Sequence, residues 1–188
     1  MPDSDPAPRP PHVSFPVPRT PTNQNLLWLQ KFAQALGILC LSVVCYFLIS
    51  HFIVQSVRVV GESMHPTLEN SQQYLLNHWV FYFRQPHRTE IVVIRDPTDR
   101  GLSVKRIIGL GGEQVFFKAG AVFINGKQLK EPYLQLGMAT FAGAYRHDQV
   151  FQCGEDEVFV LGDNRNNSLD SRAYGPIPRR SVLGLIVR

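Results

Sequence analysis

The chain has 188 residues, a formal net charge of +4 and three cysteines. That length suits one domain with an N-terminal extension. The basic residues are scattered and form no long run, which argues against a nucleic-acid partner. Cys40 and Cys45 fall in an apolar segment and Cys153 stands alone, so no disulfide framework is expected. No Cys/His cluster has the spacing of a zinc site.

Residues 1–31 are rich in proline, with eight of the fourteen prolines in the first 21 positions. Such a segment can form neither a regular helix nor a buried core. We therefore predict a disordered tail over residues 1–31.

A long apolar segment follows, from Phe32 to Val54, without a fixed charge. Its 23 residues would span about 34 Å as a helix, enough for a hydrocarbon core of about 30 Å. We predict a single transmembrane helix over residues 32–54. A buried soluble helix is rarely so long, and a cleaved signal peptide has a shorter apolar core. Arg19 and Lys31 before the segment, against Arg58 after it, give a weak bias towards a cytoplasmic tail.

The remaining residues, 55–188, contain short runs of β-branched and aromatic residues separated by Gly, Pro, Asn or Asp. This pattern predicts a mostly β domain with largely antiparallel pairing. The expected strands are Val57–Val60, Gln73–Asn77, Glu90–Arg95, Val104–Gly109, Gln114–Lys118, Ala121–Ile124, Lys127–Leu129, Glu157–Leu161 and Leu183–Val187.

Two local features refine this prediction. Asn125-Gly126 fits a type I′ turn and predicts a tight hairpin. The aromatic run Val80–Phe83 is predicted to belong to the core, and an aromatic patch on a membrane surface is the alternative.

Ser63 lies in the stretch Gly61-Glu62-Ser63-Met64-His65-Pro66-Thr67-Leu68, just after a predicted strand. A serine hydroxyl needs a base to become a nucleophile at neutral pH. The chain has no Gly-x-Ser-x-Gly elbow around this serine. His65 is two residues away and could point the same way in an extended segment, so a Ser/His pair stays open as an alternative.

Lys105 is the preferred base, provided that its pKa is lowered. Lowering the pKa from about 10.4 to about 8 requires roughly 3 kcal/mol, which burial among apolar neighbours can supply. Strand alternation predicts that one of Lys105 and Arg106 points inward and the other outward. The alternative is that both are solvated charges on an edge strand.

The stretch Gly162–Arg172 contains the third motif, with the sequence GDNRNNSLDSR. It predicts a tight loop dense in hydrogen bonds after a strand. Turn capping is the simplest role for Asp163, Asn164 and Asn167, and Asp170 could form an ion pair with Arg172.

These three motifs, in this order after one apolar segment, resemble the type I signal peptidases. The resemblance covers Val54–Arg188. It implies a membrane-anchored Ser/Lys peptidase with a β catalytic domain of the signal-peptidase type, in which Ser63 is the nucleophile and Lys105 the general base. It further implies that Ser168 orients the lysine and that the surrounding polar residues are structural supports. These supports are Asp163, Asn164, Arg165, Asp170 and Arg172.

For the substrate, the resemblance implies signal peptides of exported preproteins, cleaved outside the cytoplasmic (inner) membrane. The bound segment would add as an extended strand beside Val57–Val60 and Val104. Val59, Met64, Leu68 and Val104 are candidates for shallow apolar pockets that favour Ala-x-Ala. We expect a monomer with the lipid bilayer as a second partner, no metal or other cofactor, and no nucleic acid.

The chain departs from the family pattern at three places. Gly109-Leu110-Gly111-Gly112-Glu113 replaces Gly-Leu-Pro-Gly-Asp, which we expect to loosen a turn, and Thr89-Glu90 replaces Gly-Asp. Gly61 stands where some relatives have a serine that helps to stabilise the oxyanion, so the backbone N–H of Ser63 becomes the chief donor.

Two other functions stay open at this point. One is a catalytically degenerate β domain, favoured only by Gly111 and Glu113. The other is a Ser/Lys peptidase with a different protein substrate, such as the self-cleaving repressors. Those are soluble and carry a DNA-binding domain, so the apolar segment argues against them.

Overall fold

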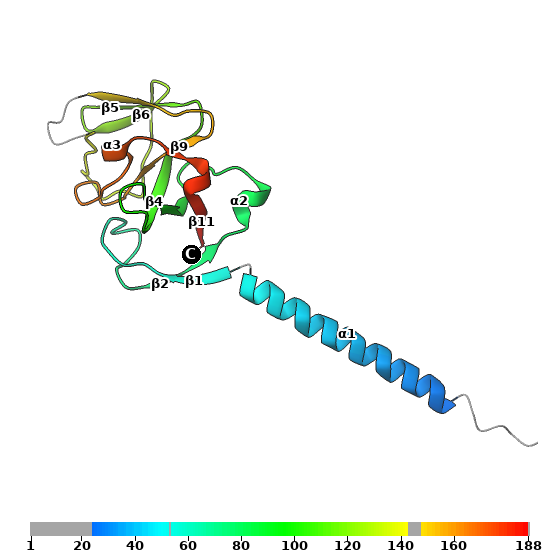
Figure 1. Ribbon diagram of the computed structural model, residues 1–188. Helices are drawn as coiled ribbons and strands as arrows, with labels where there is room; N and C mark the ends of the chain where they lie inside the picture. Colours follow the sequence, from blue (N-terminus) through cyan, green and yellow to red (C-terminus); the bar gives the residue numbers. More distant parts are fainter. Residues whose placement is uncertain (1–23, 53, 143–147, 188) are drawn as a thin grey trace, which may run out of the picture. The chain divides into compact units, whose positions relative to one another are not determined.

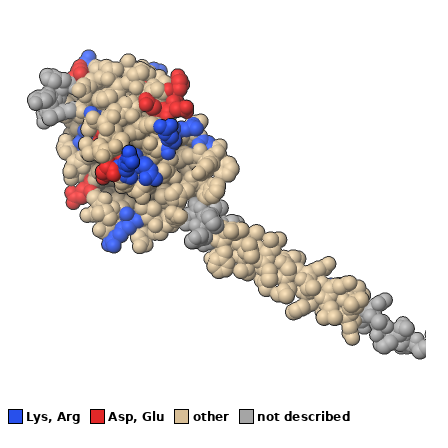
Figure 2. All heavy atoms as spheres, viewed as in Figure 1, with Lys and Arg blue, Asp and Glu red and all other residues tan. Residues whose placement is uncertain are grey.

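The computed structural model describes residues 24–52, 54–142 and 148–187. Helix α1 spans Gln24–Phe52, and within it Asn25–Leu48 is long and apolar enough to cross a membrane. The face of α1 shown in Figure 2 carries no charged side chain, whereas both signs of charge are spread over the β domain. The helix begins earlier than predicted, because residues 24–31 are helical. The rest of the predicted disordered tail, residues 1–23, lies outside the described residues. Its predicted end was wrong, because Val54 is the first residue of a strand.

The domain that follows α1 along the chain (Figure 1) is built on a seven-stranded antiparallel sheet. The strand order is β1-β2-β11-β3-β4-β9-β10. The predicted mostly β, antiparallel fold is therefore confirmed. The strands of this sheet are β1 (Val54–Arg58), β2 (Gln73–Asn77), β3 (Ile91–Arg95), β4 (Leu102–Gly109), β9 (Glu157–Leu161), β10 (Ile177–Pro178) and β11 (Val182–Val187).

A second, four-stranded sheet is inserted between β4 and β9, in the order β7-β6-β5-β8. Its strands are β5 (Gln114–Lys118), β6 (Ala121–Ile124), β7 (Lys127–Gln128) and β8 (Gln149–Gln152). Asn125 and Gly126 join β6 to β7 with φ of +48° and +78°, the left-handed values that a type I′ turn requires. Phe117 of this sheet packs in one cluster with Ile108 and Phe159 of the larger sheet, so the two sheets share a core.

The strand predictions differ from the structure mainly at their ends. Strands β2, β5, β6 and β9 have the predicted bounds, but β1 begins at Val54 and ends at Arg58, so Val59 and Val60 lie beyond it. Strands β8 and β10, the four-residue helices α2 (Val80–Phe83) and α3 (Ser171–Tyr174), and the 3₁₀ turn η1 (Arg179–Ser181) were not predicted. Each is too short to show a periodic pattern in sequence.

Helix α2 corrects the prediction that Val80–Phe83 belongs to the core. The side chains of Tyr82 and Phe83 are 79% and 84% exposed. Only Phe81 packs against the core, against the cluster around β3 and β9. The short helix thus holds one aromatic ring inward and presents two to the surroundings.

The departures at the turn after β4 do not loosen it, contrary to the prediction. The carboxylate of Glu113 accepts a hydrogen bond from the N–H of Leu110 at 2.7 Å and pairs with Arg88 at 2.5 Å. Any side chain at Gly111 would collide with the backbone carbonyl of Glu155, so glycine is required at that position. Thr89 adopts a φ of +71°, the left-handed conformation that glycine would adopt without strain.

Candidate active site

Ser63 and Lys105 meet although 42 positions separate them in the chain. Ser63 lies in an irregular segment after β1, and Lys105 lies in the middle of β4, a central strand paired with β3 and β9. The amine Nζ of Lys105 is 3.3 Å from Oγ of Ser63, within hydrogen-bond distance. Ser63 is half-buried, whereas Lys105 is only 3% exposed. A hydroxyl open to one side and a buried amine on the other is the arrangement that a serine nucleophile and its base require.

The surroundings of Lys105 favour its neutral form. Burial lowers the pKa of Lys105 below its ordinary value, and the charge of Arg172 lowers it further. The carboxylates of Asp170 and Asp96 oppose this shift, but burial is the larger effect. A buried amine with a lowered pKa can accept a proton from a neighbouring hydroxyl near neutral pH.

Both cations of β4 are buried, so the predicted outward orientation of one of them was wrong. Arg106 is 6% exposed, and its guanidinium pairs with Asp163 through two hydrogen bonds of 2.8 and 2.6 Å. The same guanidinium lies 3.8 Å from the centre of the Tyr133 ring. The side chains still alternate along the strand, but both faces of the sheet are covered at this point.

The stretch between β9 and α3 forms a braced loop over the lysine. Gly162 donates its N–H to Asp170 at 3.0 Å, and Arg165 donates to the carbonyl of Gly162 at 3.0 Å. Arg165 also pairs with Glu131 at 2.6 Å. The predicted ion pair between Asp170 and Arg172 is confirmed, with two contacts of 2.8 Å.

Asn164 connects this loop to the segment that contains Ser63. Its backbone N–H donates to the carbonyl of Ser63 at 2.9 Å, and its side-chain amide donates to the carbonyl of Glu62 at 3.1 Å. The simple turn-capping role predicted for Asn164 is therefore incomplete, because its amide reaches a segment about 100 positions away.

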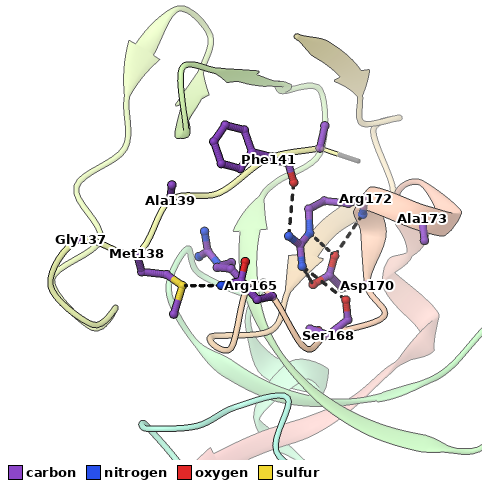
Figure 3. Close-up of a pocket in the computed structure, with 11 residues that line it drawn as sticks. Gly137, Met138, Ala139, Phe141, Arg165, Ser168, Asp170, Arg172 and Ala173 are labelled. Atoms are coloured by element: carbon purple, nitrogen blue, oxygen red, sulfur yellow. Dashed lines mark hydrogen bonds and ion pairs between the residues drawn. The ribbon is translucent and has the colours of Figure 1, made fainter. Parts of the chain in front are cut away.

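Ser168 reaches the same region but does not form the predicted hydrogen bond. Its Oγ is buried, has no hydrogen-bond partner among the described residues, and lies so close to Gly162 that any side chain there would collide with it. Ser168 also lines a hollow of about 610 Å³ beside Asp170 and Arg172 (Figure 3). Neither Ser63 nor Lys105 lines that hollow.

Three of the four residues predicted to line substrate pockets are core residues. Val59, Met64 and Leu68 are 5%, 1% and 1% exposed and pack in one cluster. Val104 is half-buried and packs against this cluster, so it alone has surface for a substrate to touch. The other three side chains belong to the core on which the segment around Ser63 packs.

The structure gives the Ser/His alternative no support. The side chain of His65 is exposed, and no hydrogen bond joins its ring to Ser63 or to any other described residue.

Several residues of the site were not predicted from the sequence. Arg106 of β4 packs on the ring of Tyr133, and Arg165 of the loop is bound by Glu131 and Thr140. The carboxylate of Asp96 raises the pKa of Lys105 and so opposes the effect of burial. No local pattern marks them, since each pairs with a residue far away in the chain. Among the described residues, no three His, Cys, Asp or Glu side chains are grouped so as to hold a metal ion.

The chain is similar to known signal peptidases over most of its length. The family model described as signal peptidase, peptidase S26, matches residues 29–188. Signal peptidase I V of Bacillus subtilis (strain 168) is 33% identical over 153 residues, which are 77% of this chain and 90% of that protein. Signal peptidase I of Leptolyngbya laminosa is 32% identical over 189 aligned residues, covering 92% of this chain and 88% of that protein.

Among solved structures, a signal peptidase I from Enterococcus faecalis V583 is 29% identical and superposes with a TM-score of 0.48. That match covers 55% of this chain and 98% of the other.

The lowered pKa of Lys105 predicts how stability depends on pH. Because the folded pKa lies below the unfolded one, burying this amine reduces the free energy of unfolding below the folded pKa. The loss fades as pH rises from the folded pKa towards the unfolded value of about 10.4. Replacing Lys105 with Met should therefore leave the domain equally or more stable near pH 7, with the difference narrowing at higher pH.

Thermal denaturation of the wild type and Lys105→Met between pH 6 and 10 measures this difference. A Met variant that is clearly less stable at every pH would mean that Lys105 is a charged structural residue.

Proposed function

Because the chain belongs to the signal peptidase family (peptidase S26), we propose that Ser63 and Lys105 form its catalytic dyad. The protein is a serine endopeptidase that cleaves signal peptides from preproteins. The observation that carries the assignment of the dyad is the 3.3 Å approach of a buried lysine amine to the hydroxyl of Ser63.

In the proposed reaction, Oγ of Ser63 attacks the scissile carbonyl while its proton passes to neutral Lys105. The oxygen of the tetrahedral intermediate accepts a hydrogen bond from the N–H of Ser63. Lys105 then protonates the leaving amine, and the peptide remains attached to Ser63 as an ester. Water then attacks the ester carbonyl and gives a proton to Lys105. As the ester bond breaks, Lys105 passes that proton to Oγ of Ser63, which releases the carboxylic acid and restores the enzyme. No step needs a metal or a cofactor.

The edges near the dyad suit a substrate bound as an extended strand. Residues Leu102–Lys105 pair with β3 on one side, whereas β9 begins to pair with β4 only at Arg106. No described strand pairs with the other side of this stretch, and we propose that a peptide backbone binds there beside Ser63. Val104 is half-buried, and we assign it to the contact with the substrate side chains.

We keep Ser168 as the residue that orients Lys105. A buried hydroxyl without a partner costs about 1–3 kcal/mol, so its environment favours any small movement that gives it one. The amine of Lys105 is a donor whose orientation matters for the reaction, and we assign it as the partner that the Ser168 hydroxyl lacks among the described residues.

The dyad is tested by replacing its members one at a time. Ser63→Ala and Lys105→Ala should each lower preprotein cleavage by about 10⁴-fold or more, because nucleophile and base act as a unit. His65→Ala should retain most of the activity. The rate of the wild-type enzyme should rise with pH through the lowered pKa of Lys105.

The controls are circular dichroism and thermal denaturation, which should show that all three variants are folded. An active Lys105→Ala enzyme, together with an inactive His65→Ala enzyme, would mean that His65 and not Lys105 is the general base.

For location, we propose that α1 anchors the enzyme in the cytoplasmic membrane with residues 55–188 on the extracytoplasmic side. Exported preproteins are cleaved on that side, and α1 is long and apolar enough to span a bilayer. Protease added from outside, after removal of any outer barrier, should digest the β domain and spare the N-terminal residues. Digestion of the N-terminal residues alone would reverse the orientation.

The exposed rings of α2 support a second contact with the lipid surface. Asn77 at the end of β2 pairs with Val54, and α2 begins three residues after Asn77. Tryptophan, tyrosine and phenylalanine side chains favour the interface between lipid and water. Tyr82 lines a hollow together with Arg179, Arg180 and Asp156, so two positive charges and one negative charge lie around it.

Trp79 is a natural probe of this contact, because the chain has only two tryptophans. In vesicles containing the full-length Trp28→Phe protein, lipids brominated near the headgroup should quench the fluorescence of Trp79. Replacing Tyr82 and Phe83 with Ser should weaken the quenching, because the rings would no longer hold α2 at the interface.

Leu136→Ser is the matched control, since Leu136 is an exposed apolar side chain in another part of the domain. Its quenching should equal that of the parent. Equal quenching in all three proteins, or none in any, would remove α2 from the membrane surface.

A further inference from the structure

Two hydrogen-bond donors orient the Glu62–Ser63 peptide group, and one of them is a side chain. The carbonyl of Glu62 accepts hydrogen bonds from the N–H of His65 at 3.1 Å and from the side-chain amide of Asn164 at 3.1 Å. The peptide is trans, so its N–H points away from its carbonyl. A carbonyl directed at Asn164 therefore directs the N–H of Ser63 to the opposite side.

The N–H of Ser63 has no acceptor among the described residues. A free backbone donor on the nucleophile itself is the group that a tetrahedral intermediate of acyl transfer needs. Its usefulness depends on direction, because a hydrogen bond weakens steeply away from linearity. Whatever fixes the Glu62 carbonyl thus also fixes this donor.

Beside the direct hydrogen bond between Lys105 and Ser63, Asn164 forms a second link between the two segments that carry them. In the larger sheet, the path from β1 to β4 runs through β2, β11 and β3. The direct route is the loop after β9, in which Asn164 donates two hydrogen bonds to the segment of Ser63. The neighbouring Asp163 is tied to Arg106, next to Lys105 on β4. Asn164 therefore holds the nucleophile segment against the strand of the base.

We propose that Asn164 is a positioning residue: its side-chain amide fixes the Glu62 carbonyl and thereby directs the N–H of Ser63 towards the oxyanion. This inference rests on the proposed dyad. It assigns Asn164 a role in the transition state rather than in substrate binding, because the oxyanion forms only after attack.

The test uses the full-length protein in detergent micelles and two variants, Asn164→Ala and Asn164→Leu. Both keep the backbone N–H that donates to Ser63 and remove only the amide, and Leu also fills the space. Loss of an oxyanion donor lowers kcat by about 10²–10³-fold, so a misdirected one should lower it by about 10–100-fold. KM should change little.

Two peptide inhibitors distinguish positioning from general damage. A peptide aldehyde adds to Ser63: a bond forms between Oγ and the carbonyl carbon, the carbonyl π bond breaks, and the serine proton ends on the new oxygen or on Lys105. The matching carboxamide binds without reacting. Both variants should bind the aldehyde more weakly, in proportion to the fall in kcat, and the carboxamide as tightly as wild type does. The pH at which activity rises should stay unchanged, because Lys105 keeps its neighbours.

Asn167→Ala is the matched control, because Asn167 is an exposed asparagine of the same loop whose side chain forms no hydrogen bond with a described residue. It should behave as wild type. Asn164 variants with wild-type kcat, or with equally weakened binding of both inhibitors, would overturn the inference while leaving the dyad intact. A wild-type enzyme that cleaves no preprotein would instead refute the proposed function.

Discussion

The rest of the site depends on one constraint, which is that a lysine amine must lose its water and still meet a serine hydroxyl. Lys105 fulfils it from β4, which lies between β3 and β9, at a point where the side chains on both faces of the sheet are buried. Covering both faces has a consequence for the next residue, because Arg106 is buried with it. A guanidinium cannot become neutral as an amine can, so it needs a partner. Asp163 supplies the charge and Tyr133 the ring face.

This burial explains why the loop after β9 is so dense in hydrogen bonds. Removing one partner of a buried ion pair costs about 3–5 kcal/mol, so Arg106 and Asp163 are held together once the fold is formed. The loop must then leave Asp163 beside β4 and still pass close to Ser63. Gly162 allows that passage, because a larger residue would collide with Ser168 and with the carbonyl of Ser63. The polar residues of the motif therefore support the base, the loop and the nucleophile at once.

The sequence predicted those parts of the molecule whose cause is local. Strands β2, β5, β6 and β9 alternate or are continuously apolar between turn residues, and the Asn125-Gly126 turn needs only its own two residues. The orientation of Arg106 could not be predicted in the same way, because alternation tells which side chains share a face but not whether both faces are covered. The cover comes from residues 131–142 and 162–165, remote in the chain. The predictions that Val80–Phe83 belongs to the core and that Met64 lines a pocket were wrong for the same reason. The local sequence around an apolar side chain does not distinguish a core position from a pocket or a surface position.

The departure from the family pattern at Gly61 follows from the backbone of the nucleophile segment. Gly61 has a φ of +114°, a conformation that residues with side chains rarely adopt, although no atom blocks the space where a Cβ would lie. Its N–H donates to the side chain of Asn70 at 3.1 Å. The segment that contains Ser63 is thus held through Asn70 at Gly61 and through Asn164 at Glu62. A serine at position 61 would strain this conformation, so the proposed oxyanion site relies on the backbone N–H of Ser63 rather than on a hydroxyl at position 61.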